Sequence, residues 1–274
     1  MERFRDKVAI VTGAASGIGR ALAIELGRRG ATVIAADLNS DGAHEVAAAI
    51  IAAGGKAAGH AVDVTVAEAI NDLIAAVVSA HGRIDYMFNN AGIGVLAEER
   101  DATAADWQRV IAVNLWGVVH GVRAVYPQML RQGFGHIVNT ASLAGLTPAP
   151  MEISYTATKY AVVGLSCALR VEAADLGVRV SVVCPGLIDT PILRTTAMRG
   201  IDTNAAQALL ASTKLMPAAA CAQAILRGVE KNKAIIVITP LARFIWLLTR
   251  LSPGLAMALW RTTFLRRVRA LRVG

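Results

Sequence analysis

Short apolar runs alternate with longer amphipathic stretches along most of the chain. The runs at 8–11 and 32–36 are separated by a glycine-rich turn and a helical stretch over 21–30, and a second helical stretch follows near 40–53. Strands that alternate with helices in this way favour an α/β fold, a doubly wound and mostly parallel sheet with helices on both faces. The seven predicted strands are 8–11, 32–36, 57–62, 84–88, 135–140, 178–184 and 234–238.

The length of the chain fits one domain followed by a short extension. Its 274 residues, 55% of them hydrophobic, lie within the range of a single open α/β unit, and no Pro- or Gly-rich linker divides them. We expect residues 1–240 to form this domain, with a substrate loop at about 187–216. Residues 241–274 are expected to form two short amphipathic helices that are broken at Ser252-Pro253-Gly254.

The positive charge of the chain is concentrated near its C-terminal end. The formal net charge is +8, but residues 231–274 contain nine Lys and Arg and no Asp or Glu. The other 230 residues carry 19 basic and 20 acidic groups. The basic residues are therefore not spread over a face with nucleic-acid-binding motifs, and we expect no nucleic-acid partner.

Cysteine and histidine show no metal-binding pattern. The three cysteines lack C-x-x-C spacing and the five histidines are dispersed, so we expect neither a metal site nor a disulfide framework. Positions 2–7 are mostly charged and do not resemble a signal peptide. No apolar run reaches the length of a membrane span. These observations predict a cytoplasmic location.

The turn between the first strand and the first helix has the composition of a phosphate-binding loop. It reads Thr12-Gly-Ala-Ala-Ser-Gly-Ile-Gly19. Glycine lets the backbone turn tightly and approach a phosphate, and the following helix offers free N–H groups and a positive dipole end. No Lys follows the last Gly, which excludes a P-loop. The turn predicts a dinucleotide-binding site, and a plain structural turn is the alternative.

Asp37 stands at the end of the second predicted strand, 18 residues after Gly19. A carboxylate at this place accepts hydrogen bonds from both hydroxyls of an adenosine ribose and repels a 2′-phosphate. The sequence therefore favours NAD over NADP. The alternative is that Asp37 only caps the next helix.

Further motifs follow in a fixed order along the chain. These are Asp63, Asn89-Asn90-Ala91-Gly92, Asn114, Ser142, Tyr155-x-x-x-Lys159 and Pro185-Gly186. With the glycine turn, the ordered set resembles the short-chain dehydrogenase/reductase family, NAD(P)-dependent oxidoreductases of Rossmann fold, from Val8 to about Pro191. The resemblance implies a homodimer or homotetramer. The cofactor-binding residues that it implies are Gly13, Ser16, Gly17, Ile18, Gly19, Asp37, Leu38, Asp63, Val64, Asn90, Ala91, Gly92, Tyr155, Lys159, Pro185, Gly186, Ile188 and Thr190.

Tyr155 and Lys159 are four residues apart in a predicted helix, so their side chains are neighbours. A phenol with a pKa of about 10 is a poor base, and an ammonium group one helical turn away is expected to lower that pKa. The resemblance implies that Tyr155 exchanges a proton with the substrate oxygen and that Lys159 also holds the nicotinamide ribose. It further implies that Ser142 hydrogen-bonds the same oxygen and that Asn114 holds a water in a proton relay to Lys159.

The segments that face the substrate in this family are apolar here. They correspond to 93–96, 143–151 and 192–193, and the first two contain no Arg or Lys to bind a carboxylate or phosphate. We therefore predict a hydrophobic secondary alcohol or ketone as substrate, such as a steroid, a retinoid or another lipid, with oxidation as the favoured direction.

The C-terminal extension leaves three interpretations open. Its Leu and aromatic residues combined with arginines are typical of an interfacial helix, which predicts peripheral membrane contact through 241–274. Alternatively it packs on a neighbouring subunit or over the substrate mouth.

Two rival functions also remain. An NADPH-dependent carbonyl reductase is opposed by Asp37, and a non-catalytic dinucleotide sensor or membrane-associated binding protein is opposed by the complete catalytic set.

Overall fold

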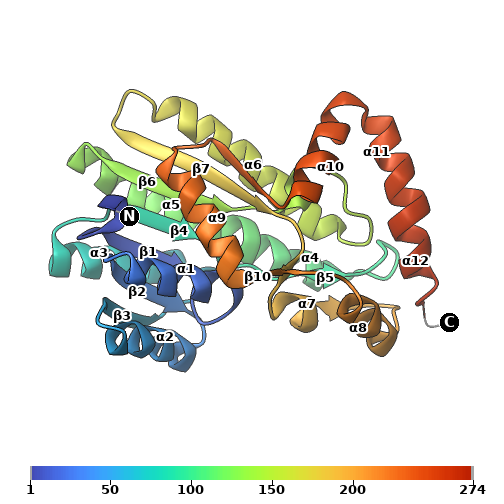
Figure 1. The fold of residues 1–274 in the computed structure, drawn as a ribbon, viewed down its shortest axis with the longest axis horizontal. Coiled ribbons are helices and arrows are strands. Elements are labelled where there is room, and N and C mark those ends of the chain that lie inside the picture. The colour runs from blue at the N-terminus through green and yellow to red at the C-terminus, as the bar shows by residue number, and fades with distance from the viewer. Residues whose placement is uncertain (1, 273–274) are drawn as a thin grey trace.

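A computed structural model describes residues 2–272 and contains a central sheet of parallel strands (Figure 1). All seven predicted strands are present, each within two residues of its predicted bounds. Their order across the sheet is β11-β7-β6-β4-β1-β2-β3. The strands are β1 (Val8–Thr12), β2 (Thr32–Asp37), β3 (Lys56–Ala61), β4 (Tyr86–Asn89), β6 (Gly135–Thr140), β7 (Val178–Pro185) and β11 (Ile235–Ile238).

Helices cover both faces of the sheet, because successive side chains of each buried strand point to opposite faces. In β1, Ile10 packs with one layer of helices, whereas Ala9 and Val11 pack with the other. The first layer comprises α3 (Ala67–His81), α5 (Gly117–Gln132) and α6 (Ile153–Glu172). The second comprises α1 (Gly17–Arg28), α2 (Ser40–Ala52) and α9 (Ala218–Glu230). The predicted doubly wound Rossmann-type α/β fold is confirmed.

The order of the strands reverses between β1 and β4. From β1 the chain moves outward through β2 and β3, and it then returns to β4 on the other side of β1 before continuing outward through β6, β7 and β11. In open parallel sheets a ligand binds at such a reversal, outside the carboxyl ends of the strands. This edge is therefore where the fold places its binding site.

Short elements surround this edge of the sheet. They are β5 (Val95–Leu96), α4 (Ala104–Ile111), a π-turn (Ala112–Trp116), a 3₁₀ turn (Leu143–Gly145), β8 (Ile188–Asp189), α7 (Ile192–Thr195), β9 (Ala197–Met198), α8 (Thr203–Ala211) and β10 (Met216–Pro217). The predicted substrate loop at 187–216 thus contains two short helices.

The C-terminal extension folds back over the substrate side of the same chain (Figure 1). It consists of α10 (Pro240–Leu251), α11 (Pro253–Leu259), a π-turn (Trp260–Leu265) and α12 (Arg266–Arg269), with the predicted break at Ser252. The Trp260 indole donates a hydrogen bond to Thr147 Oγ1 at 2.9 Å, and Arg272 forms a salt bridge with Asp101 at 2.6 Å. Among residues 2–272, no helix combines the length and the apolar character needed to cross a membrane.

His136 in β6 is a buried titratable group, and the folded protein holds its imidazole in the neutral form. Its Nε2 lies 2.8 Å from Ser181 Oγ, and that hydroxyl donates to the Lys233 carbonyl, so Nε2 carries the proton and donates. Burial, followed by the nearby charge of Arg179, lowers the pKa of His136 to about 3. The unfolded chain takes up this proton near the ordinary pKa of about 6.5, whereas the native chain does not. Stability therefore falls as the pH drops from 6.5 toward 3.

We predict that His136→Gln weakens this acid sensitivity. The glutamine amide can still donate to Ser181, but it takes up no proton. Between pH 7 and pH 5 the wild-type protein is expected to lose about 2 kcal/mol more stability than the variant. Thermal unfolding midpoints of both proteins at the two pH values measure the difference. Equal decreases in the two midpoints would show that His136 is not the group responsible.

Candidate active site

A cavity of about 450 Å³ lies at the carboxyl ends of the central strands, where the strand order reverses. It brings together nearly every residue that the sequence predicted for the site. All of the predicted cofactor-binding residues except Gly19 line it, as do Ser142, Tyr155 and Lys159. Asn114 and Gly19 lie behind its wall.

The glycine turn after β1 forms one end of the cavity. Gly13 and Gly17 have φ angles of 66° and 53°, a conformation that costs least for glycine. A Cβ on Gly19 would lie 2.0 Å from the Gly13 carbonyl oxygen, so Gly19 lets α1 pack directly against the turn. Ser16, at the N-cap of α1, makes no capping bond with its side chain and lines the cavity. The first N–H groups of α1 therefore face this end of the cavity.

Asp37 is fixed at the end of β2 beside the turn. Its Oδ2 accepts a hydrogen bond from the Ala15 N–H at 2.9 Å, and its Oδ1 accepts one from the Asn39 N–H at 2.9 Å. The N-cap of α2 is Asn39, whose side chain accepts from the Gly42 N–H. The alternative interpretation of Asp37 as a helix cap is therefore wrong.

The chain after β4 is tied to β1 and β6. Asn90 Nδ2 donates to the Thr12 carbonyl at 3.0 Å, and Thr12 Oγ1 accepts from the Asn90 N–H at 3.0 Å. The Thr140 hydroxyl donates to Asn90 Oδ1 at 3.4 Å. These bonds fix the backbone at Asn90, Ala91 and Gly92, which line the cavity. Asp63 and Val64 also line the cavity. The Asp63 carboxylate accepts hydrogen bonds from the Thr65 N–H and hydroxyl, and the N-cap of α3 is Val66, so Asp63 does not cap that helix.

Tyr155 and Lys159 lie one turn apart on α6, as predicted. Lys159 is almost completely buried, and its ammonium group donates to the Thr140 carbonyl at 2.9 Å. Burial lowers the pKa of Lys159 to about 8. The Nζ atom lies over the face of the Tyr155 ring, 5.4 Å from its centroid. The ammonium group therefore interacts with the ring and not with the phenol oxygen.

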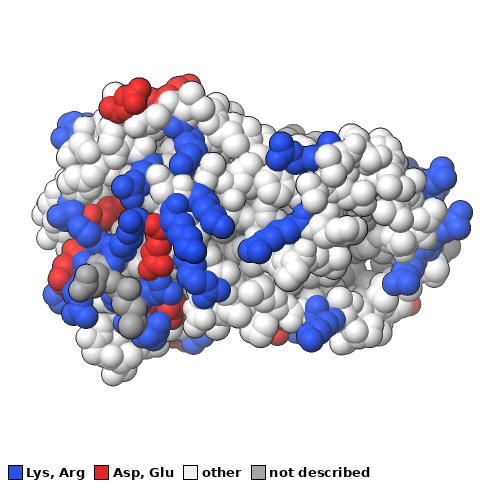
Figure 2. All heavy atoms as spheres, turned by 45° about the horizontal axis from the view of Figure 1, so that its top comes forward, with Lys and Arg blue, Asp and Glu red and all other residues white. Residues whose placement is uncertain are grey.

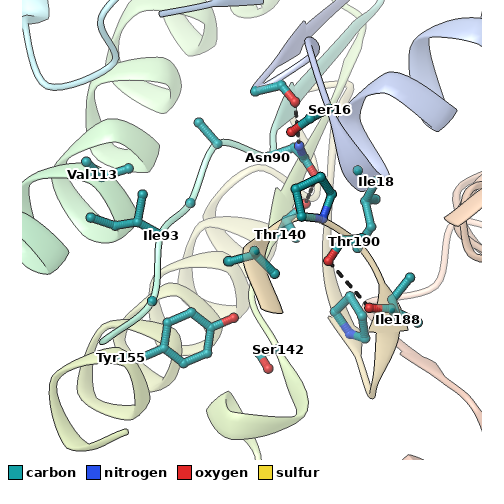
Figure 3. A pocket seen from close by; sticks show the side chains of 18 of the residues that line it. Ser16, Ile18, Asn90, Ile93, Val113, Thr140, Ser142, Tyr155, Ile188 and Thr190 are labelled. Carbon is teal, nitrogen blue, oxygen red and sulfur yellow. Dashed lines mark hydrogen bonds between the residues drawn. The ribbon is translucent and has the colours of Figure 1, made fainter. Parts of the chain in front are cut away.

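The expected lowering of the Tyr155 pKa by Lys159 is wrong for this structure. Burial raises the pKa of the Tyr155 phenol, the charge of Glu152 raises it further, and the Ser142 hydroxyl acts in the opposite direction. In this structure the Lys159 ammonium group donates to the Thr140 carbonyl and lies over the ring, so it does not contact the phenol oxygen. Figure 3 shows the Tyr155 ring and the Ser142 side chain close to each other in the cavity.

Ser142 follows β6 at the N-cap of the 3₁₀ turn, and its Oγ accepts a hydrogen bond from the Ala144 N–H at 3.1 Å. The hydroxyl proton therefore remains available to donate into the cavity.

Asn114 is completely buried in the π-turn between α4 and α5. Its amide exchanges two hydrogen bonds of 2.9 Å with the Ile93 backbone, which fixes the loop after Gly92. The water relay through Asn114 stays a prediction.

The model of the short chain dehydrogenase family matches residues 7–199 of this sequence. The protein belongs to the short-chain dehydrogenase family. Cyclohexanol dehydrogenase of Acinetobacter sp. (strain SE19) is 40% identical to it over 192 residues, which cover 70% of this chain and 76% of that protein. The oxidoreductase SadH of Mycobacterium tuberculosis (strain ATCC 25618 / H37Rv) is 36% identical over 255 residues, which cover 92% of each chain.

A solved structure extends the similarity to the whole fold. The crystal structure of a short chain dehydrogenase/reductase from Burkholderia phymatum in complex with NAD matches with a TM-score of 0.84 and 32% identity. The match covers 93% of this chain and 96% of that one. As a short-chain dehydrogenase, the protein is an oxidoreductase of a family that binds a nicotinamide dinucleotide.

The cavity residues fit such a cofactor. The turn at Gly13 and Gly17 packs closely against the chain after β4, because a Cβ at Gly13 would lie 2.8 Å from the Ala91 backbone. The free N–H groups at the start of α1 beside this turn can receive a pyrophosphate. Asp37 lines this cavity together with Lys159, Ile188, Thr190, Tyr155 and Ser142. The cavity thus joins the glycine turn to these polar side chains, as a site for a nicotinamide dinucleotide requires.

Two features of this short-chain dehydrogenase differ from the sequence-based prediction. The apolar segment 143–151 does not line the cavity. Leu143 and Leu146 pack into the main core, and Met151 packs with the C-terminal extension. In its place Glu152 reaches the cavity, and sequence reasoning missed it. Its position three residues before Tyr155, at the start of the helix, was the signal available.

Proposed function

We propose that the protein is an NAD-dependent alcohol dehydrogenase that interconverts hydrophobic secondary alcohols and ketones. The observation that carries the proposal is the convergence of Ser142, Tyr155 and Lys159 with Asp37 and the glycine turn in one cavity. Acid–base groups at one end and a dinucleotide-binding turn at the other are what hydride transfer to a nicotinamide requires.

In the direction of oxidation, the phenolate form of Tyr155 takes the proton from the substrate hydroxyl as the carbinol carbon loses its hydride. When bound, NAD supplies the nicotinamide ring that accepts this hydride. Ser142 donates a hydrogen bond to the substrate oxygen, which keeps the oxygen near the Tyr155 phenol. In the reverse direction the phenol returns the proton to the ketone oxygen.

In this proposal Lys159 stabilises the phenolate form of Tyr155 and binds the ribose of the cofactor. Its positive charge lies within one helical turn of Tyr155, and its ammonium group can reorient from the Thr140 carbonyl toward the phenol oxygen and the ribose of a bound cofactor. A phenolate gains stability from a positive charge placed this close. The pKa of Lys159 at about 8 keeps the ammonium form in the majority at neutral pH.

NAD is preferred over NADP in this proposal because Asp37 offers a carboxylate and because its neighbour Leu38 offers no positive charge to a 2′-phosphate. An NADPH-dependent carbonyl reductase is the rival function. The hydrophobic substrate class is supported by the side chains of Ile93, Leu187, Ile192 and Leu193 in the cavity wall and by the similarity to a cyclohexanol dehydrogenase.

The test of the proposal is formation of NADH from NAD by the purified protein, followed by near-ultraviolet absorbance. The panel contains cyclohexanol, larger cyclic alcohols and a steroid alcohol, and each is assayed in parallel with NADP. Turnover with NAD is the expected result. Binding of NAD without turnover of any alcohol or ketone would favour the rival class, a non-catalytic dinucleotide sensor.

The C-terminal extension supports a peripheral membrane contact as a further part of the proposal. The outward face of α10 exposes Leu241, Phe244, Leu247 and Leu251. On the right of Figure 2, toward the C-terminal helices, Lys and Arg side chains are scattered over an otherwise uncharged surface with little acidic surface in view. We propose a cytoplasmic homodimer or homotetramer that contacts anionic lipid through this face. Co-sedimentation with anionic but not with zwitterionic vesicles is the expected result, and sedimentation with neither would contradict it.

A further inference from the structure

Glu152 is an acidic side chain without a partner in the wall of the cavity. Its carboxyl group makes no capping hydrogen bond and no salt bridge among the described residues, and burial raises its pKa to about 7. Among the described residues, the one fully enclosed side-chain oxygen or nitrogen without a hydrogen bond is Asn89 Oδ1, whereas Glu152 is partly exposed. The Glu152 oxygens are therefore open to the cavity and not sealed in the protein.

The backbone holds Glu152 in a defined position. Met151 before it has a φ of 67°, which is strained for a residue with a side chain, and its carbonyl accepts a hydrogen bond from the Ala97 N–H at 2.8 Å. Glu152 itself pairs with Ala97 in a short parallel bridge. It is the N-cap residue of α6, yet its side chain makes no capping bond. The carboxyl group is thus free for another use.

The environment of Glu152 selects the chemistry of its partner. A ligand that covers this carboxyl group without offering it a hydrogen bond leaves it unsatisfied, which disfavours a purely apolar ligand. A carboxylate or phosphate on the ligand would be repelled by it. A cationic amine would meet the Lys159 ammonium group in the same cavity. A neutral hydroxyl avoids both repulsions, because it can donate to the carboxylate form and accept from the carboxylic acid form.

Glu152 also lies close to the reacting position. It stands at the N-cap of α6, less than one helical turn before Tyr155, and both side chains line the same cavity. The effect of its charge on the Tyr155 pKa supports this proximity. The two side chains can therefore contact two oxygens of one small ring, a few bonds apart.

Given the proposed function, we propose that Glu152 is a specificity-determining residue that hydrogen-bonds a second hydroxyl group of the substrate. The preferred substrates are then hydrophobic alcohols with a further hydroxyl next to, or one carbon away from, the carbinol carbon. Tyr155 exchanges the proton of one oxygen, and Glu152 fixes the orientation of the other.

The experiment compares kcat/KM for cyclohexanol with that for the cis and trans isomers of cyclohexane-1,2-diol and cyclohexane-1,3-diol. It uses the wild-type protein, Glu152→Gln, Glu152→Leu and a control variant, Glu45→Leu, which changes an exposed acid on α2 outside the cavity. NAD binding by calorimetry shows that each variant is folded. The wild-type protein and Glu45→Leu are expected to prefer at least one diol over cyclohexanol by about ten-fold or more.

Glu152→Leu is expected to reduce the ratio of kcat/KM for the preferred diol to that for cyclohexanol by about ten-fold or more, because Leu offers no hydrogen bond to the second hydroxyl group. Glu152→Gln, which still donates and accepts hydrogen bonds, is expected to keep most of the preference. An unchanged ratio in Glu152→Leu, or a wild-type preference for cyclohexanol, would overturn the role of Glu152 alone. If the wild-type protein turned over neither class with NAD, the proposed function would fail and this inference with it.

Discussion

Replacement of Tyr155 by Phe is expected to lower kcat by about a thousand-fold, with NAD affinity unchanged within a few-fold. The variant keeps the ring, which packs beside Val95, Ala97 and Val110 and lies under the Lys159 ammonium group. It removes only the hydroxyl that exchanges the proton. Steady-state rates with the best alcohol of the panel and calorimetric titration with NAD measure the two quantities.

Tyr160→Phe is the matched control for this experiment. Tyr160 lies on the same helix, but its side chain is exposed and it does not line the cavity. Its loss of a hydroxyl should leave kcat unchanged. If Tyr155→Phe retained more than about a tenth of the wild-type rate, a value far above what loss of a general acid–base group allows, Tyr155 would not be the proton-exchanging group.

The second large effect is expected at Asp37. The double variant Asp37→Asn, Leu38→Arg should lower the ratio of kcat/KM for NAD to that for NADP by about a hundred-fold or more, because like charges placed together cost several kcal/mol. Asn keeps an oxygen that can accept from the Ala15 or Asn39 N–H. Leu38 is 74% exposed, so an Arg side chain has room at that position.

Asp41→Asn provides the control for the change of charge. Asp41 lies in the first turn of the following helix, is exposed and stands outside the cavity. The ratio for this variant should equal that of the wild-type protein. A double variant that retained the wild-type preference for NAD would show that Asp37 does not select the cofactor.

The sheet and the position of the site could be predicted from the sequence for a simple physical reason. Each buried parallel strand is a short apolar run with its own turn signal, and all carboxyl ends of such strands lie at one edge of the sheet. Residues that follow strands, such as Gly13, Asp37, Asn90, Ser142 and Pro185, are therefore brought together by topology alone. Tyr155 and Lys159 reach the same edge from one face of α6.

The remaining features depend on packing that no local pattern encodes. The segment 143–151 is apolar whether it faces a substrate or the core, and only its contacts with α6 and the C-terminal extension decide between the two. The orientation of the Lys159 ammonium group is set by the Thr140 carbonyl, which lies 19 residues earlier on β6. The helical break at Ser252 was predictable, whereas the salt bridge from Arg272 to Asp101 was not.

Transfer of deuterium from substrate to cofactor tests the central claim most directly. The purified protein is incubated with NAD and with cyclohexanol, or the best alcohol of the panel, deuterated at the carbinol carbon. Mass spectrometry of the recovered cofactor is expected to show one deuterium per NADH formed, with about a thousand-fold slower formation of NADH by Tyr155→Phe. Recovery of unchanged NAD with every alcohol, or of NADH without deuterium, would contradict direct hydride transfer from a secondary alcohol in this cavity.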